Sequence, residues 1–130
     1  MHKEFGGVVK TILIVDDHER IRELVAATLG DIGDYQILEA KNAEEGVTLA
    51  RESHPNLVLM DVTMPGAYDG LEAARIIKSD PDTSDIYVVM LTAKGQMSDV
   101  ERGDEAGVDG YFVKPFSPIE LINKVESLLG

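Results

Sequence analysis

The sequence has no cysteine, no long apolar run and few positive charges, and each absence excludes a class of protein. Without a cysteine among its 130 residues, the chain can form no disulfide framework and use no thiolate chemistry. No apolar stretch approaches the roughly 20 residues of a transmembrane helix, and no secretory signal pattern opens the chain. We therefore expect no membrane insertion, and a cytoplasmic location fits these features.

Positive charge is scarce, because 12 Lys and Arg stand against 24 Asp and Glu and leave a formal net charge of −12. Such a chain repels the phosphates of nucleic acids, so direct binding to nucleic acid is not expected. The charge suits a protein that binds divalent cations or basic partner surfaces, and simple solubility would explain it equally well.

What is present is the pattern of one globular domain, expected over residues 11–130 after a lead-in segment at 1–10. Five short apolar runs are expected to be strands: 11–15, 35–40, 57–60, 86–91 and 110–113. The first, third and fourth are continuously apolar, which is typical of strands buried on both faces of a parallel sheet.

Segments with helical spacing of apolar residues separate and follow these runs. The expected helices cover 21–30, 43–50, 71–77, 98–106 and 117–129. Asn42 with Glu45, and Ser117 with Glu120, predict N-terminal caps, whereas Gly103 weakens the fourth helix. The alternation of strands and helices predicts an α/β fold with a single, doubly wound, five-stranded parallel sheet and helices on both faces.

Charged and polar residues end four of the five apolar runs. Asp16 and Asp17 follow the first run, Asp61 the third, Thr92 the fourth and Lys114 the fifth. Ligands of open α/β sheets bind beyond the carboxyl ends of the strands, where the strand order reverses. We therefore expect these side chains to approach one another, although in isolation Asp17 could be a helix N-cap and Thr92 an ordinary strand end.

Three carboxylates gathered in this way would need a cation. Like unit charges ~5 Å apart repel by roughly 3 kcal/mol at an effective dielectric constant near 20. Lys114 offsets one of the three charges, and a divalent ion would offset the rest. Carboxylate oxygens with room for waters and a phosphate suit Mg²⁺, so the sequence predicts a magnesium site.

Four motifs together resemble the receiver domain of two-component response regulators: "IVDDHER", "LVLMDVTMPGAYDG", "VVMLTAKG" and "GYFVKPFSP". Each motif alone is common, but all four occur in the right order at the ends of the right strands. The resemblance extends from about Thr11 to Leu129 and implies the strand order 2-1-3-4-5.

The resemblance assigns roles to the acidic residues. It implies that Asp61 accepts a phosphoryl group and that Mg²⁺, or Mn²⁺ in its place, binds beside it. Asp17 would be a direct metal ligand, Asp16 would act through water, and the backbone carbonyl of Thr63 would supply a further oxygen.

The resemblance also assigns the signalling residues. Thr92 would donate a hydrogen bond to the phosphoryl group, Lys114 would pair with it, and Tyr111 would be the switch aromatic. Tyr111 could equally be an ordinary half-buried strand residue. The Lys114–Pro115 peptide bond is expected to be cis.

The implied function is a phosphorylation-activated signalling switch. The donor would be a histidine kinase or histidine phosphotransfer protein, and a downstream protein target would bind the face formed by the fourth helix, fifth strand and fifth helix. Such a protein is not an enzyme in the turnover sense. Two alternatives remain: a small phosphatase of the haloacid-dehalogenase type, and a degenerate receiver that serves as a binding scaffold.

Some positions stand apart from the family pattern. The loop after Asp61, "MPGAYDG", has one residue more than usual, and Thr63 and Lys94 flank the phosphoryl position and should influence the phosphate lifetime. His18 is expected on an exposed first helical turn and His54 in a loop.

Overall fold

The computed structural model describes residues 9–32, 35–93 and 106–129, in which strands and helices alternate. The strands are β1 (Lys10–Val15), β2 (Tyr35–Ala40), β3 (Leu57–Asp61), β4 (Tyr87–Ala93) and β5 (Gly110–Lys114). The helices are α1 (Glu19–Ile32), α2 (Ala43–Ser53), α3 (Gly70–Ser79) and α5 (Pro118–Leu129). The fourth predicted helix, 98–106, lies almost wholly outside the described residues.

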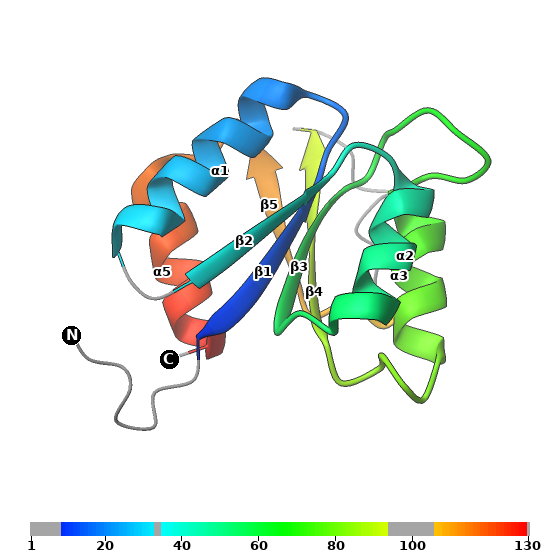
Figure 1. The fold of residues 1–130 in the computed structure, drawn as a ribbon. Coiled ribbons are helices and arrows are strands. Elements are labelled where there is room, and N and C mark those ends of the chain that lie inside the picture. The colour runs from blue at the N-terminus through cyan, green and yellow to red at the C-terminus, as the bar shows by residue number, and fades with distance from the viewer. Residues whose placement is uncertain (1–8, 33–34, 94–105, 130) are drawn as a thin grey trace.

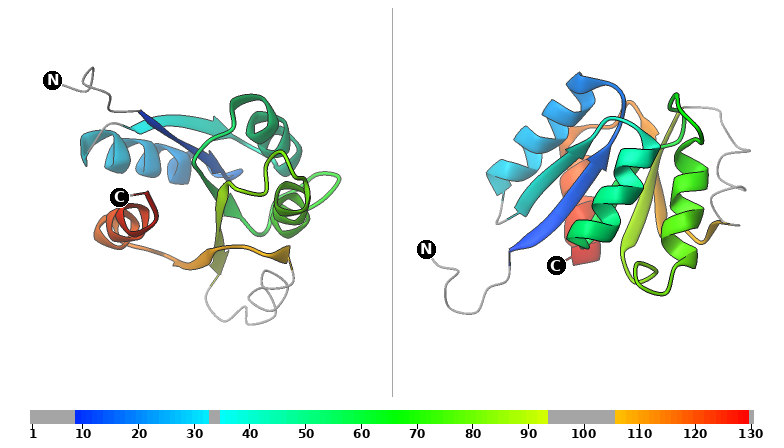
Figure 2. Two further views of the ribbon diagram at one scale, coloured as in Figure 1. Left: turned by 90° about the horizontal axis from the view of Figure 1, so that it is seen from below. Right: turned by 45° about the vertical axis from the view of Figure 1, so that its right-hand side comes forward.

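The five strands form one parallel sheet in the order β2-β1-β3-β4-β5, which confirms the expected topology. Helices α1 and α5 cover one face and α2 and α3 the other (Figures 1 and 2). From β1 the chain moves first outward to β2 and later to β3 on the other side. The strand order therefore reverses between β1 and β3, which is where a ligand site is expected in such a sheet.

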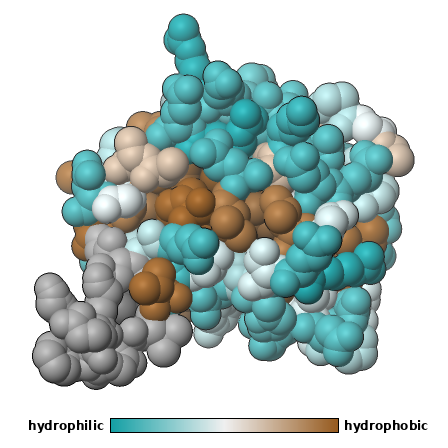
Figure 3. Space-filling view, in the orientation of Figure 1, coloured by the Kyte–Doolittle hydropathy of each residue, from teal (hydrophilic) through white to brown (hydrophobic). Residues whose placement is uncertain are grey.

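Two hydrophobic cores lie on opposite faces of the sheet, one beneath α2 and α3 and the other beneath α1 and α5. All five residues of β3 are buried, which confirms the interpretation of the apolar runs as strands covered on both sides. The face seen in Figure 3 is largely hydrophilic, with a hydrophobic band across its middle. None of the described helices combines the length and apolar character needed to cross a bilayer.

The predicted helix caps are present. The Asn42 side chain accepts a hydrogen bond from the Glu45 backbone N–H at 2.8 Å. Ser117 and Glu120 bond reciprocally, each side chain accepting from the backbone N–H of the other, at 3.2 and 3.3 Å. These contacts satisfy N–H groups that the helix itself leaves without partners, which explains why α2 and α5 begin at these positions.

The structure of α1 differs from the predicted helix in two respects. It continues past Gly30 to Ile32, because Gly30 lies on the exposed side without the positive φ that a glycine C-cap requires. Leu24, assigned to the apolar face, is 37% exposed, whereas Val25 and Leu29 are fully buried. Strand β4 also differs from its prediction, because it runs on to Ala93 and so contains Thr92 within the strand.

Gly70 is where α3 approaches the end of β3 most closely. A Cβ atom at Gly70 would lie 1.7 Å from the backbone oxygen of Asp61, whereas one at Gly30 would meet nothing within 4 Å. We expect Gly70→Ala to lower the free energy of unfolding by at least about 2 kcal/mol, because the backbone itself must move. Gly30→Ala should raise it by about 0.5–1 kcal/mol, because alanine favours an exposed helix.

Urea unfolding of the two variants beside the wild type measures both changes. A Gly70→Ala protein as stable as the wild type would show that α3 does not need this close approach to β3.

Candidate functional site

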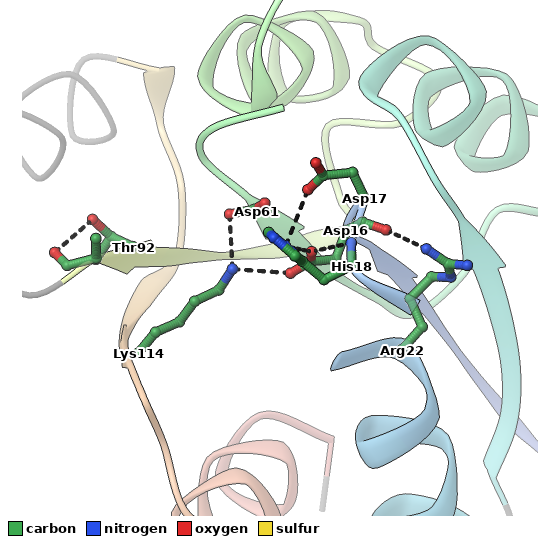
Figure 4. Close-up of polar contacts among 8 residues, drawn as sticks. Asp16, Asp17, His18, Arg22, Asp61, Thr92 and Lys114 are labelled. Carbon is green, nitrogen blue, oxygen red and sulfur yellow. Dashed lines mark hydrogen bonds and ion pairs between the residues drawn. The ribbon is translucent and has the colours of Figure 1, made fainter. Parts of the chain in front are cut away.

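The charged residues that end the strands converge at one edge of the sheet (Figure 4). Asp16 and Asp17 directly follow β1, Asp61 ends β3 and Lys114 ends β5. One ligand atom from each of Asp16, Asp17, His18 and Asp61 lies within 4.8 Å of the others. The predicted approach of the three acids is present in the structure, because parallel strands direct their carboxyl ends to the same edge.

A single ammonium group holds two of the acids. The Lys114 Nζ donates to Asp16 Oδ2 at 3.0 Å and to Asp61 Oδ1 at 3.1 Å, across the intervening strand β4. Asp16 is completely buried and Asp61 is 5% exposed. Burial alone would lower the pKa of Lys114, but the hydrogen bonds and charges of both carboxylates outweigh it and hold that pKa above its ordinary value.

The carboxyl group of Asp61 is harder to ionise than an ordinary aspartate. Burial, followed by the negative charge of Asp16, raises its pKa from 3.8 to about 6. The charge of Lys114 and its hydrogen bond offset part of this rise, and Asp17 adds to it. Asp61 is therefore ionised at neutral pH, but in a site that holds more negative than positive charge.

Backbone and side-chain contacts fix Asp16 on every side. Its Oδ1 accepts from the His18 backbone N–H at 2.9 Å, and its carbonyl oxygen accepts from the Arg22 guanidinium at 2.7 Å. Its own N–H donates to the Ala40 carbonyl at 3.1 Å. With Oδ2 bonded to Lys114, both carboxylate oxygens have protein partners, whereas the neighbouring Asp17 side chain is 31% exposed.

His18 is exposed, as expected, but its ring lies against the acids, a contact that we did not predict from the sequence. It precedes α1, and its carbonyl accepts from the N–H groups of Ile21 and Arg22 at 3.1 and 3.3 Å. His18, not Asp17, is therefore the residue at the cap position of α1. Its Nδ1 lies 3.0 Å from Asp16 Oδ1 and 3.3 Å from Asp17 Oδ1. The signal was the two-residue spacing from Asp16, which permits the turn in which an Asp side chain accepts from the backbone two residues later.

A cavity of about 280 Å³ opens over the acids, and Asp17, His18, Asp61, Thr63 and Lys114 contribute to its wall. Thr63 belongs to the loop between β3 and α3 and is exposed there, so this predicted residue does reach the site.

The far part of that loop is held against α2. Gly66 has a φ of 132°, a conformation that only glycine adopts readily, and the next N–H, of Ala67, donates to Glu44 Oε1 at 3.2 Å. The longer loop noted in the sequence is therefore fastened to α2 at Glu44, outside the cavity.

The two predicted switch residues are placed differently. Thr92 is buried in β4, its Oγ1 lies 3.4 Å from the Ala93 carbonyl, and it is not among the described residues that line the cavity (Figure 4). Tyr111 is half-buried and packs against the core beneath α2 and α3. The Lys114–Pro115 peptide bond is cis, as expected.

The donor set fits a hard divalent cation. Three carboxyl groups stand beside one ammonium group, and a divalent ion would supply the positive charge that the site has too little of. Asp17 is exposed enough to reach a cation, and the Asp61 oxygen that Lys114 does not contact accepts no hydrogen bond from any described residue. Oxygen ligands beside an open, hydrated cavity are the environment that Mg²⁺ prefers.

The raised pKa of Asp61 predicts a pH-dependent stability in the presence of a chelator. An exposed Asp titrates near 4, so the folded state holds this proton more tightly than the unfolded chain. The stability that protonation contributes is complete below pH 4 and is lost as the pH rises through about 6. The free energy of unfolding of Asp61→Asn should therefore exceed that of the wild type by about 1–3 kcal/mol at pH 8, and the difference should shrink towards pH 4.

Urea unfolding of both proteins at several pH values measures the difference. An advantage of the variant that stays the same from pH 4 to pH 8 would contradict the raised pKa, since that advantage would not come from ionisation.

Comparisons with known proteins identify the arrangement. The family model of the response regulator receiver domain matches residues 12–126. The phosphate regulon transcriptional regulatory protein PhoB of Pseudomonas aeruginosa is 43% identical over 122 residues, covering 94% of this chain and 52% of that protein. The transcriptional regulatory protein ResD of Bacillus subtilis is 43% identical over 118 residues, covering 91% and 47%. The chain thus spans about half the length of these curated relatives.

Solved structures agree. A putative response regulator from Chloroflexus aurantiacus superposes with a TM-score of 0.87 at 34% identity, covering 94% of this chain and 98% of that one. The chemotaxis protein CheY4 of Vibrio cholerae superposes with a TM-score of 0.86 at 28% identity, covering 94% and 100%. These matches decide against the haloacid-dehalogenase-type phosphatase that the sequence left open. The chain belongs to the family of response regulator receiver domains.

Proposed function

We propose that this receiver domain is switched by a phosphoryl group on Asp61, delivered by a histidine kinase or a histidine phosphotransfer protein. One observation carries the proposal. Asp61 presents an oxygen without a hydrogen bond from any described residue at the wall of the cavity, while Lys114 holds its other oxygen at 3.1 Å. The carboxylate is thereby oriented, and a nucleophilic oxygen remains for an incoming phosphorus atom.

The transfer exchanges one bond to phosphorus for another. The carboxylate oxygen of Asp61 attacks the phosphorus of the donor phosphohistidine, the N–P bond breaks, and the histidine nitrogen retains the electron pair. A bound Mg²⁺ would disperse the charge of the transferring group. Lys114, already beside Asp61, supplies a positive charge for the new phosphoryl oxygens. Later attack by water on the phosphorus releases inorganic phosphate and restores the carboxylate.

The acids divide the task of holding the metal. Asp17 is the direct ligand, because its side chain is partly exposed and faces the cavity. Asp16 acts through water, because its two oxygens are occupied by the His18 N–H and Lys114. The carbonyl of Thr63 supplies a further oxygen from the cavity wall. The same assignment accommodates Mn²⁺ in place of Mg²⁺.

The proposed role is that of a switch and not of an enzyme with turnover, and a cytoplasmic location belongs to the same proposal. The domain would catalyse only its own phosphorylation and its slow dephosphorylation. A degenerate receiver that acts as a scaffold is less well supported, because the three acids and Lys114 keep the contacts that phosphorylation needs.

Acetyl phosphate with Mg²⁺ should add one phosphoryl group to the wild type and none to Asp61→Asn, because the amide is not a nucleophile for phosphorus. Asp31→Asn is the matched control: Asp31 is exposed at the end of α1, away from the cavity, and this variant should be labelled like the wild type. Intact-mass measurement reads the result. Equal labelling of Asp61→Asn and the wild type would remove Asp61 from its assigned role.

We further propose that Thr92 and Tyr111 transmit phosphorylation to a protein target on the face of the fourth helix, β5 and α5. In the described part of that face, Val113 and Ile119 are 50% and 69% exposed, which offers apolar contact to a partner. Thr92, on the strand next to Asp61, would move towards the phosphoryl oxygens, and the half-buried Tyr111 ring would follow into the space behind it. A partner that prefers this arrangement reads the signal.

Tyr111→Ala should keep phosphorylation at Asp61 but lose the coupled change on that face, because no ring remains to follow Thr92. Amide chemical shifts recorded with and without a beryllofluoride mimic of the phosphoryl group measure the change. Wild-type shift changes in the variant along 117–129 would show that Tyr111 is not the relay.

A further inference from the structure

None of the roles proposed above explains why the His18 side chain lies in the acidic site. Its Nδ1 lies 3.0 Å from Asp16 Oδ1 and 3.3 Å from Asp17 Oδ1. Neighbouring ligands on an octahedral ion with bonds of about 2.1 Å are about 3.0 Å apart, which is close to both spacings. The imidazole nitrogen and the Asp17 oxygen are therefore placed like two adjacent ligands of a single cation.

The ring nitrogen lies within hydrogen-bonding distance of Asp16, but the Asp16 carboxylate does not depend on that contact. Asp16 Oδ1 already accepts from the His18 backbone N–H at 2.9 Å, and Oδ2 accepts from Lys114 at 3.0 Å. The carboxylate therefore keeps a partner on each oxygen when the ring nitrogen binds a cation instead. The ring is 66% exposed, so it does not stay at this position through burial in the core.

The backbone of His18 delivers the ring to the cavity. Its N–H is bonded to Asp16, and its carbonyl accepts the first hydrogen bonds of α1, from Ile21 and Arg22. With both backbone groups held, only the side-chain torsions remain free. The ring contributes to the same cavity wall as Asp17 and Asp61 (Figure 4). A ring nitrogen is therefore positioned beside the oxygen donors before any cation arrives.

We infer that His18 supplies a nitrogen ligand to the divalent cation of this site. Imidazole binds Co²⁺, Ni²⁺ and Zn²⁺ more strongly than it binds Mg²⁺, which prefers oxygen and retains its waters. This receiver domain therefore selects transition-metal ions over Mg²⁺ more strongly than its carboxylates alone would. The inference rests on the proposed cation site of the phosphorylation switch and adds to it the class of metal that the site prefers.

Calorimetric titration of the metal-free protein with Mg²⁺ and, separately, with Co²⁺ tests the inference. His18→Ala should weaken Co²⁺ binding by about tenfold or more while changing Mg²⁺ binding by less than about threefold, because only Co²⁺ gains from the nitrogen. Asp17→Asn should weaken both ions. His54→Ala is the matched control, since His54 pairs with Asp85 elsewhere on the molecule, and it should change neither.

A spectroscopic signature identifies the ligand directly. The proton NMR spectrum of the Co²⁺-loaded wild type should contain a strongly shifted, solvent-exchangeable signal from the Nε2–H of a coordinated imidazole. That signal should be absent from His18→Ala and present in His54→Ala.

The outcomes separate the two levels of the account. If the wild type binds neither ion, or if its binding does not depend on Asp17, the proposed cation site is wrong and the inference is wrong with it. Suppose instead that Mg²⁺ binds as proposed while His18→Ala weakens the binding of both ions equally or of neither ion, or that the shifted signal survives in that variant. In either case His18 is not a ligand, and only this inference is overturned.

Discussion

The ammonium group of Lys114, shared between two buried carboxylates, is the contact on which the site depends. It joins the end of β5 to Asp61 at the end of β3 and to Asp16 after β1. One positive charge among three carboxylates leaves the site short of positive charge. Burial is the first cause of the raised pKa of Asp61, and this deficit adds to it. The deficit also explains why a divalent cation fits the site.

The strand order brings together the residues that make this contact. Because the strand order is β2-β1-β3-β4-β5, the acids of β1 and β3 are neighbours, while the lysine of β5 must reach across β4. The two hydrophobic cores hold the strands in this order, and Gly70 lets α3 pass close to the Asp61 backbone. A phosphoryl group on Asp61 would compete with Asp16 for Lys114. Phosphorylation would therefore alter the contact that joins the end of β5 to the residue after β1.

The sequence predicted what depends on pattern and missed what depends on exact side-chain placement. Buried parallel strands leave continuous apolar runs, and polar residues at the ends of four runs mark the site, so the parallel sheet and the acids were foreseeable. The strand order came from the resemblance to receiver domains and not from the pattern itself. The reach of α1 past Gly30 and the exposure of Leu24 were not, because they depend on how α1 lies against the sheet. The ring of His18 was placed by a local turn at Asp16 that apolar periodicity does not register.

The titration of the Asp61 carboxyl carbon by ¹³C NMR tests the central claim, a site with too little positive charge, most directly. In metal-free protein this carbon should titrate near pH 6, and saturating Mg²⁺ should move its midpoint well below that value, because the ion supplies the missing charge. A midpoint near 4 in metal-free protein, or one that Mg²⁺ leaves unchanged, would contradict the account.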